Sequence, residues 1–248
     1  MNATLGAAGR STHPRVPSRT QQVRTMITDY ILREGIKAGE PIPPESKLIE
    51  LTGASRSAVR EALKVMEALG FVSIKRGSGT FVNDINLEAL TTQLIFASQR
   101  DADDGYSTLR DMVQLRSVLE TSLVRIACHA DEQNVAELRV IIARMDAEQH
   151  AGYVTTDTDR EFHVALYERL GNALYAPLVS ALFDAYIRVP FESTIRKQQF
   201  AHAQRHRAIV DALESRDEAA CVKAMKAHFD PIIAHLTTYS QENSHNRG

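Results

Sequence analysis

The sequence predicts a mainly α-helical protein, with an N-terminal winged helix-turn-helix carrying a small β-hairpin wing and a C-terminal antiparallel α-helical bundle. Charge is divided along the chain, because residues 1–82 carry 12 Lys and Arg against 7 Asp and Glu and the remainder carries 17 against 24. Eight of the 12 glycines and five of the 8 prolines precede residue 80, so turns concentrate in the first part. Beyond residue 83, apolar residues recur with helical spacing in longer segments.

These patterns divide the 248 residues into four segments. A flexible N-terminal tail without periodicity occupies residues 1–19, and a flexible C-terminal tail occupies residues 241–248. The winged helix covers residues 20–83 and the all-helical domain covers residues 84–240. Within the bundle, helices are expected at roughly 86–100, 107–130, 133–150, 156–170, 173–188, 193–214 and 217–239.

The composition excludes several classes of protein. No apolar run approaches the ~20 residues of a membrane-spanning helix, and no signal peptide opens the chain, so a cytoplasmic protein with no membrane partner is expected. The two cysteines, Cys128 and Cys221, are too few for a disulfide framework and are expected to be reduced core residues.

The first part shows the order of elements of a winged helix. Apolar spacing predicts a helix over 21–34, a short helix over 44–51 after a proline-rich turn, and a third helix over 55–69. Two short β-type runs, 71–75 and 80–82, flank a glycine-containing tip and predict a hairpin.

Basic and hydroxyl side chains at the start of the third helix and in the wing form a candidate DNA interface. Arg56 and Arg60 lie four residues apart, hence on one helical face, and arginine can donate two hydrogen bonds to guanine in the major groove. The alternative is that both are solvated charges paired with Glu50, Glu61 or Glu67. The candidates in the helix are Ser55, Arg56, Ser57 and Arg60, and those in the wing are Lys75, Arg76 and Gly77.

The stretch PPESKLIELTGASRSAVREALKVMEALGFVSIKRGSGTFV resembles the winged-helix signature of the GntR family of bacterial transcription regulators. The resemblance covers about residues 21–82. It implies that the four helix candidates contact DNA and that Arg76 and Gly77 form the wing tip. Some members carry a DNA-contacting arginine where this chain has Ser46, so its half-site preference is expected to differ.

Four side chains in the predicted all-helical domain are candidate metal ligands. Asp159 and His163 are four residues apart and share one helical face. His206 and His228 lie on consecutive predicted helices, each two to three turns from their connection, so they can reach similar height in an antiparallel pair. One carboxylate and three imidazoles suit Zn²⁺, Ni²⁺ or Mn²⁺, while each histidine alone is also compatible with an ordinary core or surface position.

The same residues belong to a sequence pattern that consists of D-x3-H, a following Gly-Asn, HR-x-IVDAL and AM-x-x-H. This pattern resembles the FCD ligand-binding domain of the fatty-acid-regulator subfamily of GntR proteins, over about residues 87–237. The resemblance implies that these four residues bind a divalent metal, most simply zinc, beside a small organic acid. By the same resemblance Arg116 occupies the position of a pocket arginine, with Asn172 and Arg188 as weaker effector-binding candidates. Arg116 could instead pair internally with Glu120.

These features predict a metabolite-responsive transcriptional regulator, most simply a repressor, that binds a palindromic operator in double-stranded DNA as a homodimer. Two alternatives remain. In the first, the metal is purely structural. In the second, the bundle is a metal-dependent hydrolase with Glu161 as its base, although no nucleophile motif or phosphate loop accompanies this residue and no enzyme activity is expected.

Overall fold

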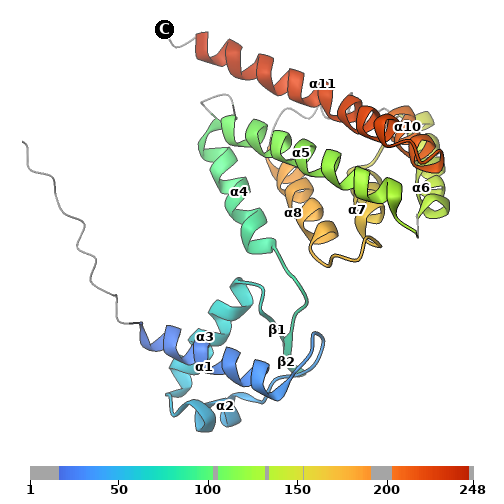
Figure 1. Cartoon of the computed structure of the whole chain (residues 1–248). Coiled ribbons are helices and arrows are strands. Elements are labelled where there is room, and N and C mark those ends of the chain that lie inside the picture. Colours follow the sequence, from blue (N-terminus) through green and yellow to red (C-terminus); the bar gives the residue numbers. More distant parts are fainter. Residues whose placement is uncertain (1–16, 103–105, 132–133, 153, 191–202, 246–248) are drawn as a thin grey trace, which may run out of the picture. The chain divides into compact units, whose positions relative to one another are not determined.

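The computed structural model describes residues 17–102, 106–131, 134–152, 154–190 and 203–245. It is mainly helical with one two-stranded antiparallel sheet, which confirms the predicted fold class (Figure 1). Packing divides the chain into two compact units, Met1–Asp84 and Ile85–Gly248, each with its own hydrophobic core.

The N-terminal unit contains three helices followed by a hairpin. Their bounds are α1 Arg19–Glu34, α2 Glu45–Thr52, α3 Arg56–Ala68, β1 Val72–Lys75 and β2 Gly79–Val82. Helix α1 begins at Arg19 because the Ser18 hydroxyl accepts a hydrogen bond from the Gln21 amide at 3.2 Å, so the chain is helical slightly before the expected boundary. Gly35 ends α1 with a left-handed φ of +66°, which glycine adopts without strain.

Apolar side chains from all three helices form the core of this unit. Val23 and Ile27 of α1 are buried with Leu48 of α2 and with Val59 and Met66 of α3, each at most 1% exposed. The segment between α1 and α2 hydrogen-bonds to strand β2 of the hairpin. The Ile42 amide donates to the Thr80 carbonyl at 2.9 Å, and the Val82 amide donates to the Glu40 carbonyl at 2.9 Å. The proline-rich turn therefore fixes the wing to the helices.

The C-terminal unit is built from helices whose bounds are α4 Glu88–Arg100, α5 Ser107–His129, α6 Val135–His150, α7 Thr156–Tyr167, α8 Tyr175–Arg188, α10 Ala203–Glu214 and α11 Glu218–His245. Helix α11 lies along α5, and α8 packs against α4, α5 and α7 (Figure 1). Helix α6 contacts α7 and α10. The packing brings α5, α7, α10 and α11 around a common interior.

The C-terminal end of the last helix differs from the prediction. Helix α11 continues through Pro231 to His245, so residues 241–245 are helical and not part of the expected tail. The predicted start of the preceding helix at 193 lies outside the described residues, and the described part of α10 begins at Ala203. Cys128 and Cys221 are free and buried, as expected. Within the described chain, no helix combines the length and apolarity needed to cross a membrane.

Candidate DNA interface and ligand pocket

The N-terminus of α3 presents an exposed basic edge. The Ser55 hydroxyl accepts a hydrogen bond from the Ala58 amide at 3.3 Å and lies 3.0 Å from the Ser57 hydroxyl. Arg56 is exposed and makes no ion pair with any residue that the structure describes. Arg60 lies one turn later, with its Nε 3.6 Å from a Glu45 carboxylate oxygen.

Two of the three carboxylates expected to compete for these arginines are engaged elsewhere. Glu50 accepts a hydrogen bond from Lys47 at 2.9 Å, and Glu67 accepts one from the Ile74 amide at 2.9 Å. The partner of Arg60 is Glu45, on the short helix α2, and both side chains are about half exposed. An exposed pair of this kind contributes only about 0–1 kcal/mol, so phosphate oxygens can displace it.

The wing adds basic side chains on a tight turn. Lys75 and Arg76 are exposed, and the Lys75 ammonium lies 4.8 Å from the centre of the Phe81 ring. Gly77 has a φ of +76°, a left-handed conformation that favours glycine at this tip. The wing candidates therefore lie together at the closed end of the hairpin.

Three histidines from three helices meet inside the C-terminal unit. His163 of α7, His206 of α10 and His228 of α11 offer ring nitrogens that all lie within 4.8 Å of one another. Asp159 of α7 joins them, because one of its carboxylate oxygens lies 2.8 Å from His206 Nε2 and 3.6 Å from His163 Nε2. The structure thus brings together all four ligands expected from the sequence.

Electrostatics favour the metal-binding protonation states of His163, His228 and Asp159. Burial, with added repulsion from Arg116 and neighbouring histidines, holds the pKa of both His163 and His228 well below the usual range. Burial acts to raise the pKa of Asp159, but the hydrogen bond with His206 and the positive charge of Arg116 act against it, and this pKa is lowered. Neutral imidazoles and an ionised carboxylate are the forms that bind metals.

Glu120 of α5 sets the direction in which His163 offers its lone pair. Its carboxylate is fully buried and lies 2.5 Å from His163 Nδ1, while the Tyr167 hydroxyl donates to it at 3.1 Å. A neutral His163 therefore holds its proton on Nδ1, between ring and carboxylate. His163 Nε2 is buried without a hydrogen-bond partner and lies beside the other two histidines, so the residues present fit a divalent cation.

Arg116 makes the internal pair with Glu120 and also lines a pocket, while its effector-binding role stays a prediction. Its Nε donates to Glu120 at 2.5 Å, so the internal pair exists. Its guanidinium also lies 4.5 Å from the centre of the Phe183 ring and 5.2 Å from that of Phe229, and its Nη2 is buried without a hydrogen-bond partner. Because only the Nε edge is used by Glu120, the terminal nitrogens remain for an anion.

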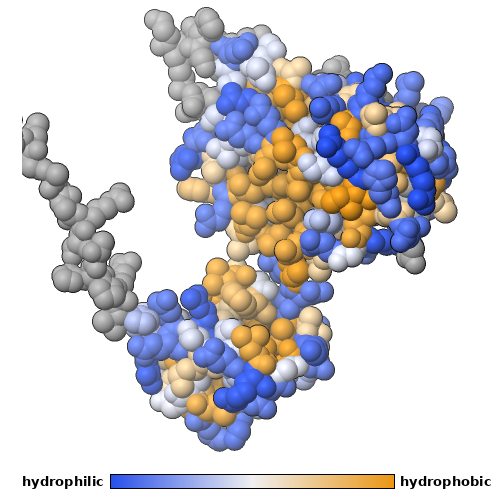
Figure 2. Space-filling view, viewed as in Figure 1, coloured by the Kyte–Doolittle hydropathy of each residue, from blue (hydrophilic) through white to orange (hydrophobic). Residues whose placement is uncertain are grey.

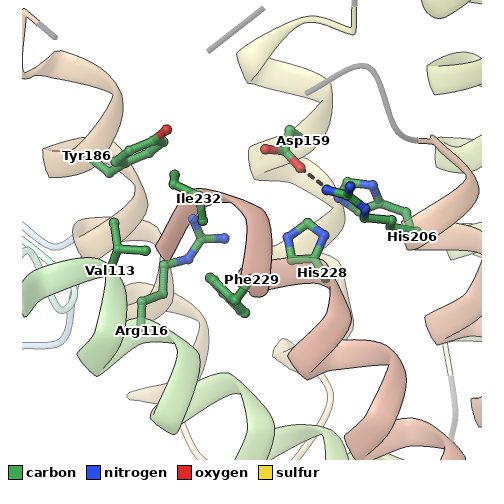
Figure 3. Close-up of a pocket in the computed structure, with 9 residues that line it drawn as sticks. Val113, Arg116, Asp159, Tyr186, His206, His228, Phe229 and Ile232 are labelled. Atoms are coloured by element: carbon green, nitrogen blue, oxygen red, sulfur yellow. Dashed lines mark hydrogen bonds and ion pairs between the residues drawn. The ribbon is translucent and has the colours of Figure 1, made fainter. Parts of the chain in front are cut away.

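Arg116 and two of the histidines, His206 and His228, line one pocket with an empty volume of about 460 Å³, its open mouth included. In Figure 3, Arg116 extends from α5 on one side, and Asp159, His206 and His228 stand on the other. Among the residues that the structure describes, the lining is formed by Val113, Arg116, Asp159, Tyr186, Arg205, His206, His228, Phe229 and Ile232. The sequence reasoning missed Tyr186 and Arg205, because helical spacing does not show which neighbouring helix closes over a given face.

Asn172 and Arg188 do not line this pocket, so their positions give no support to the expected effector-binding role. The Asn172 side-chain oxygen accepts a hydrogen bond from the Leu174 amide at 2.9 Å and shapes the turn before α8. Arg188 is about half exposed and pairs with Glu88 at 2.7 Å, which ties the end of α8 to α4. The base considered for a hydrolase, Glu161, pairs with Arg144 on the surface and is also absent from the lining.

A winged helix with a basic recognition edge, followed by a helical bundle with a polar interior pocket, defines the class of DNA-binding transcriptional regulators that carry a ligand-binding domain. The family comparison agrees, because the model of bacterial regulatory proteins of the gntR family matches residues 19–82 and the FCD domain model matches residues 111–231. The chain belongs to the gntR family and is a transcriptional regulator with an FCD domain.

Relatives over nearly the whole chain are regulators too. The HTH-type transcriptional repressor NanR of Cronobacter sakazakii is 29% identical over 246 residues, covering 95% of this chain and 93% of the relative. The Uxu operon transcriptional regulator of Escherichia coli is 26% identical and covers 89% and 87%. A solved structure of Streptococcus agalactiae GntR shares the fold, with a TM-score of 0.64, 21% identity and coverage of 87% of this chain and 99% of that one.

Proposed function

We propose that this regulator is a metabolite-responsive repressor that binds a palindromic operator as a homodimer. Its pocket holds a divalent cation, most simply Zn²⁺ and alternatively Ni²⁺ or Mn²⁺, on Asp159, His163, His206 and His228. The effector is a small organic carboxylate bound between that cation and Arg116. The observation that carries the effector assignment is the buried Arg116 Nη2, which lacks a hydrogen-bond partner and belongs to a residue of the same pocket as His206 and His228.

The chemistry of the pocket favours an anion. A buried guanidinium nitrogen without a partner is costly unless an acceptor reaches it, and a carboxylate supplies two acceptor oxygens. The cation, when bound, supplies a Lewis-acidic partner for an anionic oxygen. Val113, Phe229 and Ile232 line the same pocket and can cover the apolar part of a small acid.

On the DNA side, Ser55, Arg56, Ser57 and Arg60 enter the major groove, while Lys75, Arg76 and Gly77 approach the minor groove or the phosphates. The 12 basic against 7 acidic residues up to Val82 favour phosphate neutralisation, so affinity falls with added salt. The name of the NanR relative supports the repressor assignment.

Regulation follows from unequal affinity for two states. A carboxylate held by Arg116 and a cation links α5 to α7, α10 and α11, so it favours the arrangement in which these helices are closest. An effector changes operator affinity only by as much as its own affinity differs between the operator-binding state and the released state. The effector therefore shifts the population away from the operator-binding arrangement.

Calorimetry on metal-loaded protein with a panel of small carboxylates tests the pocket. Arg116→Met is expected to weaken binding of the responsive acid by about 10–100-fold, since a charge-assisted hydrogen bond contributes about 1.5–3 kcal/mol. Arg188→Met removes an arginine outside the pocket and is the matched control, with unchanged affinity. Circular dichroism verifies that both variants fold. Equal affinity of folded Arg116→Met and wild type would remove Arg116 from the effector site.

The same measurement distinguishes a purely structural metal. An acid that binds loaded protein but not stripped, still folded protein uses the cation directly. An acid that binds both forms equally assigns the cation a structural role and leaves the regulator without a metal-dependent effector site.

A further inference from the structure

An unpartnered stripe follows the outer face of α5. Asp111, Leu115, Val118, Ser122 and Arg125 are exposed and succeed one another at steps of four, three, four and three residues. That spacing averages 3.5 residues, the repeat with which one helix packs lengthwise against another. Figure 2 shows hydrophobic residues gathered over the face of the C-terminal unit that carries α5.

The centre of the stripe is apolar. Leu115 is 58% exposed and Val118 is 67% exposed, with Ile126 beside the stripe at 44%. On their inner side, the neighbouring residues Met112, Val113 and Leu123 are buried in the core. Helix α5 is thus apolar on two opposite sides, and the described residues of this unit cover only one of them.

The two ends of the stripe carry opposite charges at equal distances from Val118. Asp111 precedes Val118 by seven residues and Arg125 follows it by seven, so each lies two turns away, about 10 Å along the helix. When two copies of α5 pack antiparallel with Val118 on the two-fold axis, Asp111 of each copy faces Arg125 of the other. Their existing partners are at least partly exposed, since Arg110 lies 3.1 Å from Asp111 with its side chain 29% exposed and Glu218 lies 3.8 Å from Arg125 with its side chain 47% exposed, so Asp111 and Arg125 can both exchange partners.

We propose that this stripe is a docking surface for a second copy of the chain, formed by antiparallel α5 helices that cross at Val118. The surface is self-complementary, as a two-fold interface requires: apolar side chains meet at the axis, and one Asp–Arg pair closes each end. The proposal rests on the dimeric regulator of the proposed function and names the helix that joins its two copies.

A cysteine on the two-fold axis tests the geometry directly. In full-length Val118→Cys, the two new thiols face each other, so oxidised glutathione converts them into an intermolecular disulfide while it is reduced to two thiols. Val140→Cys is the matched control, because Val140 is 69% exposed on α6 and outside the stripe. Cys128 and Cys221 are both 0% exposed, so they are not expected to react in the folded protein. The expected result is a disulfide-linked dimer for Val118→Cys only.

Charge exchange tests the register. Asp111→Arg and Arg125→Asp each place like charges at both ends of the interface, so each is expected to raise the dimer dissociation constant about 10-fold in sedimentation experiments. The double variant restores opposite charges and is expected to return to wild-type affinity. Val118→Arg opposes two cations at the axis and is expected to weaken the dimer at least about 100-fold, whereas Val140→Arg leaves it unchanged.

The outcomes separate the interface from the proposed function. A wild-type dimer that binds operator DNA, with no cross-link in Val118→Cys and no rescue in the double variant, overturns the α5 interface alone. A monomeric wild type also overturns it and leaves the stripe to a different protein. If wild-type protein prefers no DNA sequence over competitor, the proposed function fails whether or not Val118→Cys is cross-linked.

Discussion

Replacing Glu120 by glutamine tests how the pocket orients its histidines. The Glu120 carboxylate is 0% exposed and lies 2.5 Å from both Arg116 Nε and His163 Nδ1, with the Tyr167 hydroxyl at 3.1 Å. Glutamine keeps the shape but has one acceptor oxygen instead of two and adds an amide that donates. It therefore satisfies either Arg116 or His163, and the proton of His163 is no longer fixed on Nδ1.

Two magnitudes follow from these contacts. Loss of a carboxylate behind a metal-binding imidazole typically lowers metal affinity about 10–100-fold, and zinc competition with a chromophoric chelator measures this change. Removing one partner of a buried ion pair typically costs about 3–5 kcal/mol, and glutamine should approach the lower end because it retains one hydrogen bond. Urea unfolding of metal-free protein measures the free energy of unfolding separately.

Glu161→Gln is the control, because Glu161 lies on α7 but pairs with Arg144 at the surface, with both side chains almost half exposed. Its metal affinity should not change, and its stability should change by less than about 1 kcal/mol. Folded Glu120→Gln with wild-type zinc affinity would refute the claim that Glu120 directs His163 Nε2 toward a cation.

Three further predictions concern DNA, pH and packing. Arg56→Ala should lower specific operator affinity by about 1–3 kcal/mol in a mobility shift, while Arg33→Ala on α1 should not reduce the preference over competitor DNA. Burial lowers the pKa of His163 and His228, so protons compete with a metal for these side chains only below the usual histidine range near ~6.5. The metal content, measured by elemental analysis, should therefore be equal at about pH 7 and 8 and should fall toward about pH 5. Equal metal content at all three pH values contradicts the histidine site. Phe162→Ala removes a 0% exposed ring that lies 4.7 Å from His206 between centroids and should cost about 3–5 kcal/mol in urea unfolding, whereas Phe96→Ala, at a ring 66% exposed, should cost less than about 1 kcal/mol.

Local chemistry made the N-terminal unit predictable. The cap at Ser55, the breaks at Gly35 and Gly53 and the glycines of the wing each act on their immediate neighbours, and α3 begins at Arg56, within one residue of the predicted start at 55. The end of α11 was less predictable, since the helix extends to His245 in a segment whose polar composition suggested a tail.

The pocket residues also divide into those whose proximity the sequence predicts and those whose proximity it does not. Asp159 and His163 share a helical face at a spacing of four, so their proximity follows from the sequence, while His206 and His228 were assigned through the family resemblance. Tyr186 and Arg205 line the pocket only because α8 and α10 pack around α5, α7 and α11, and such long-range packing leaves no local pattern. For Arg116, the sequence offered pairing with Glu120 or exposure to the pocket, whereas different guanidinium nitrogens provide both.

The charges of the residues around the pocket determine which ligand charge the pocket favours. Arg116 and Glu120 cancel each other as an ion pair, and the ionised Asp159 is offset by Arg205 of the same lining, so the charged groups of the metal-free pocket sum to zero. The proposed divalent cation on Asp159, His163, His206 and His228 would add two positive charges to that balance. It would therefore strengthen the attraction of the pocket for an anion, to which Arg116 and Arg205 of the described lining already contribute.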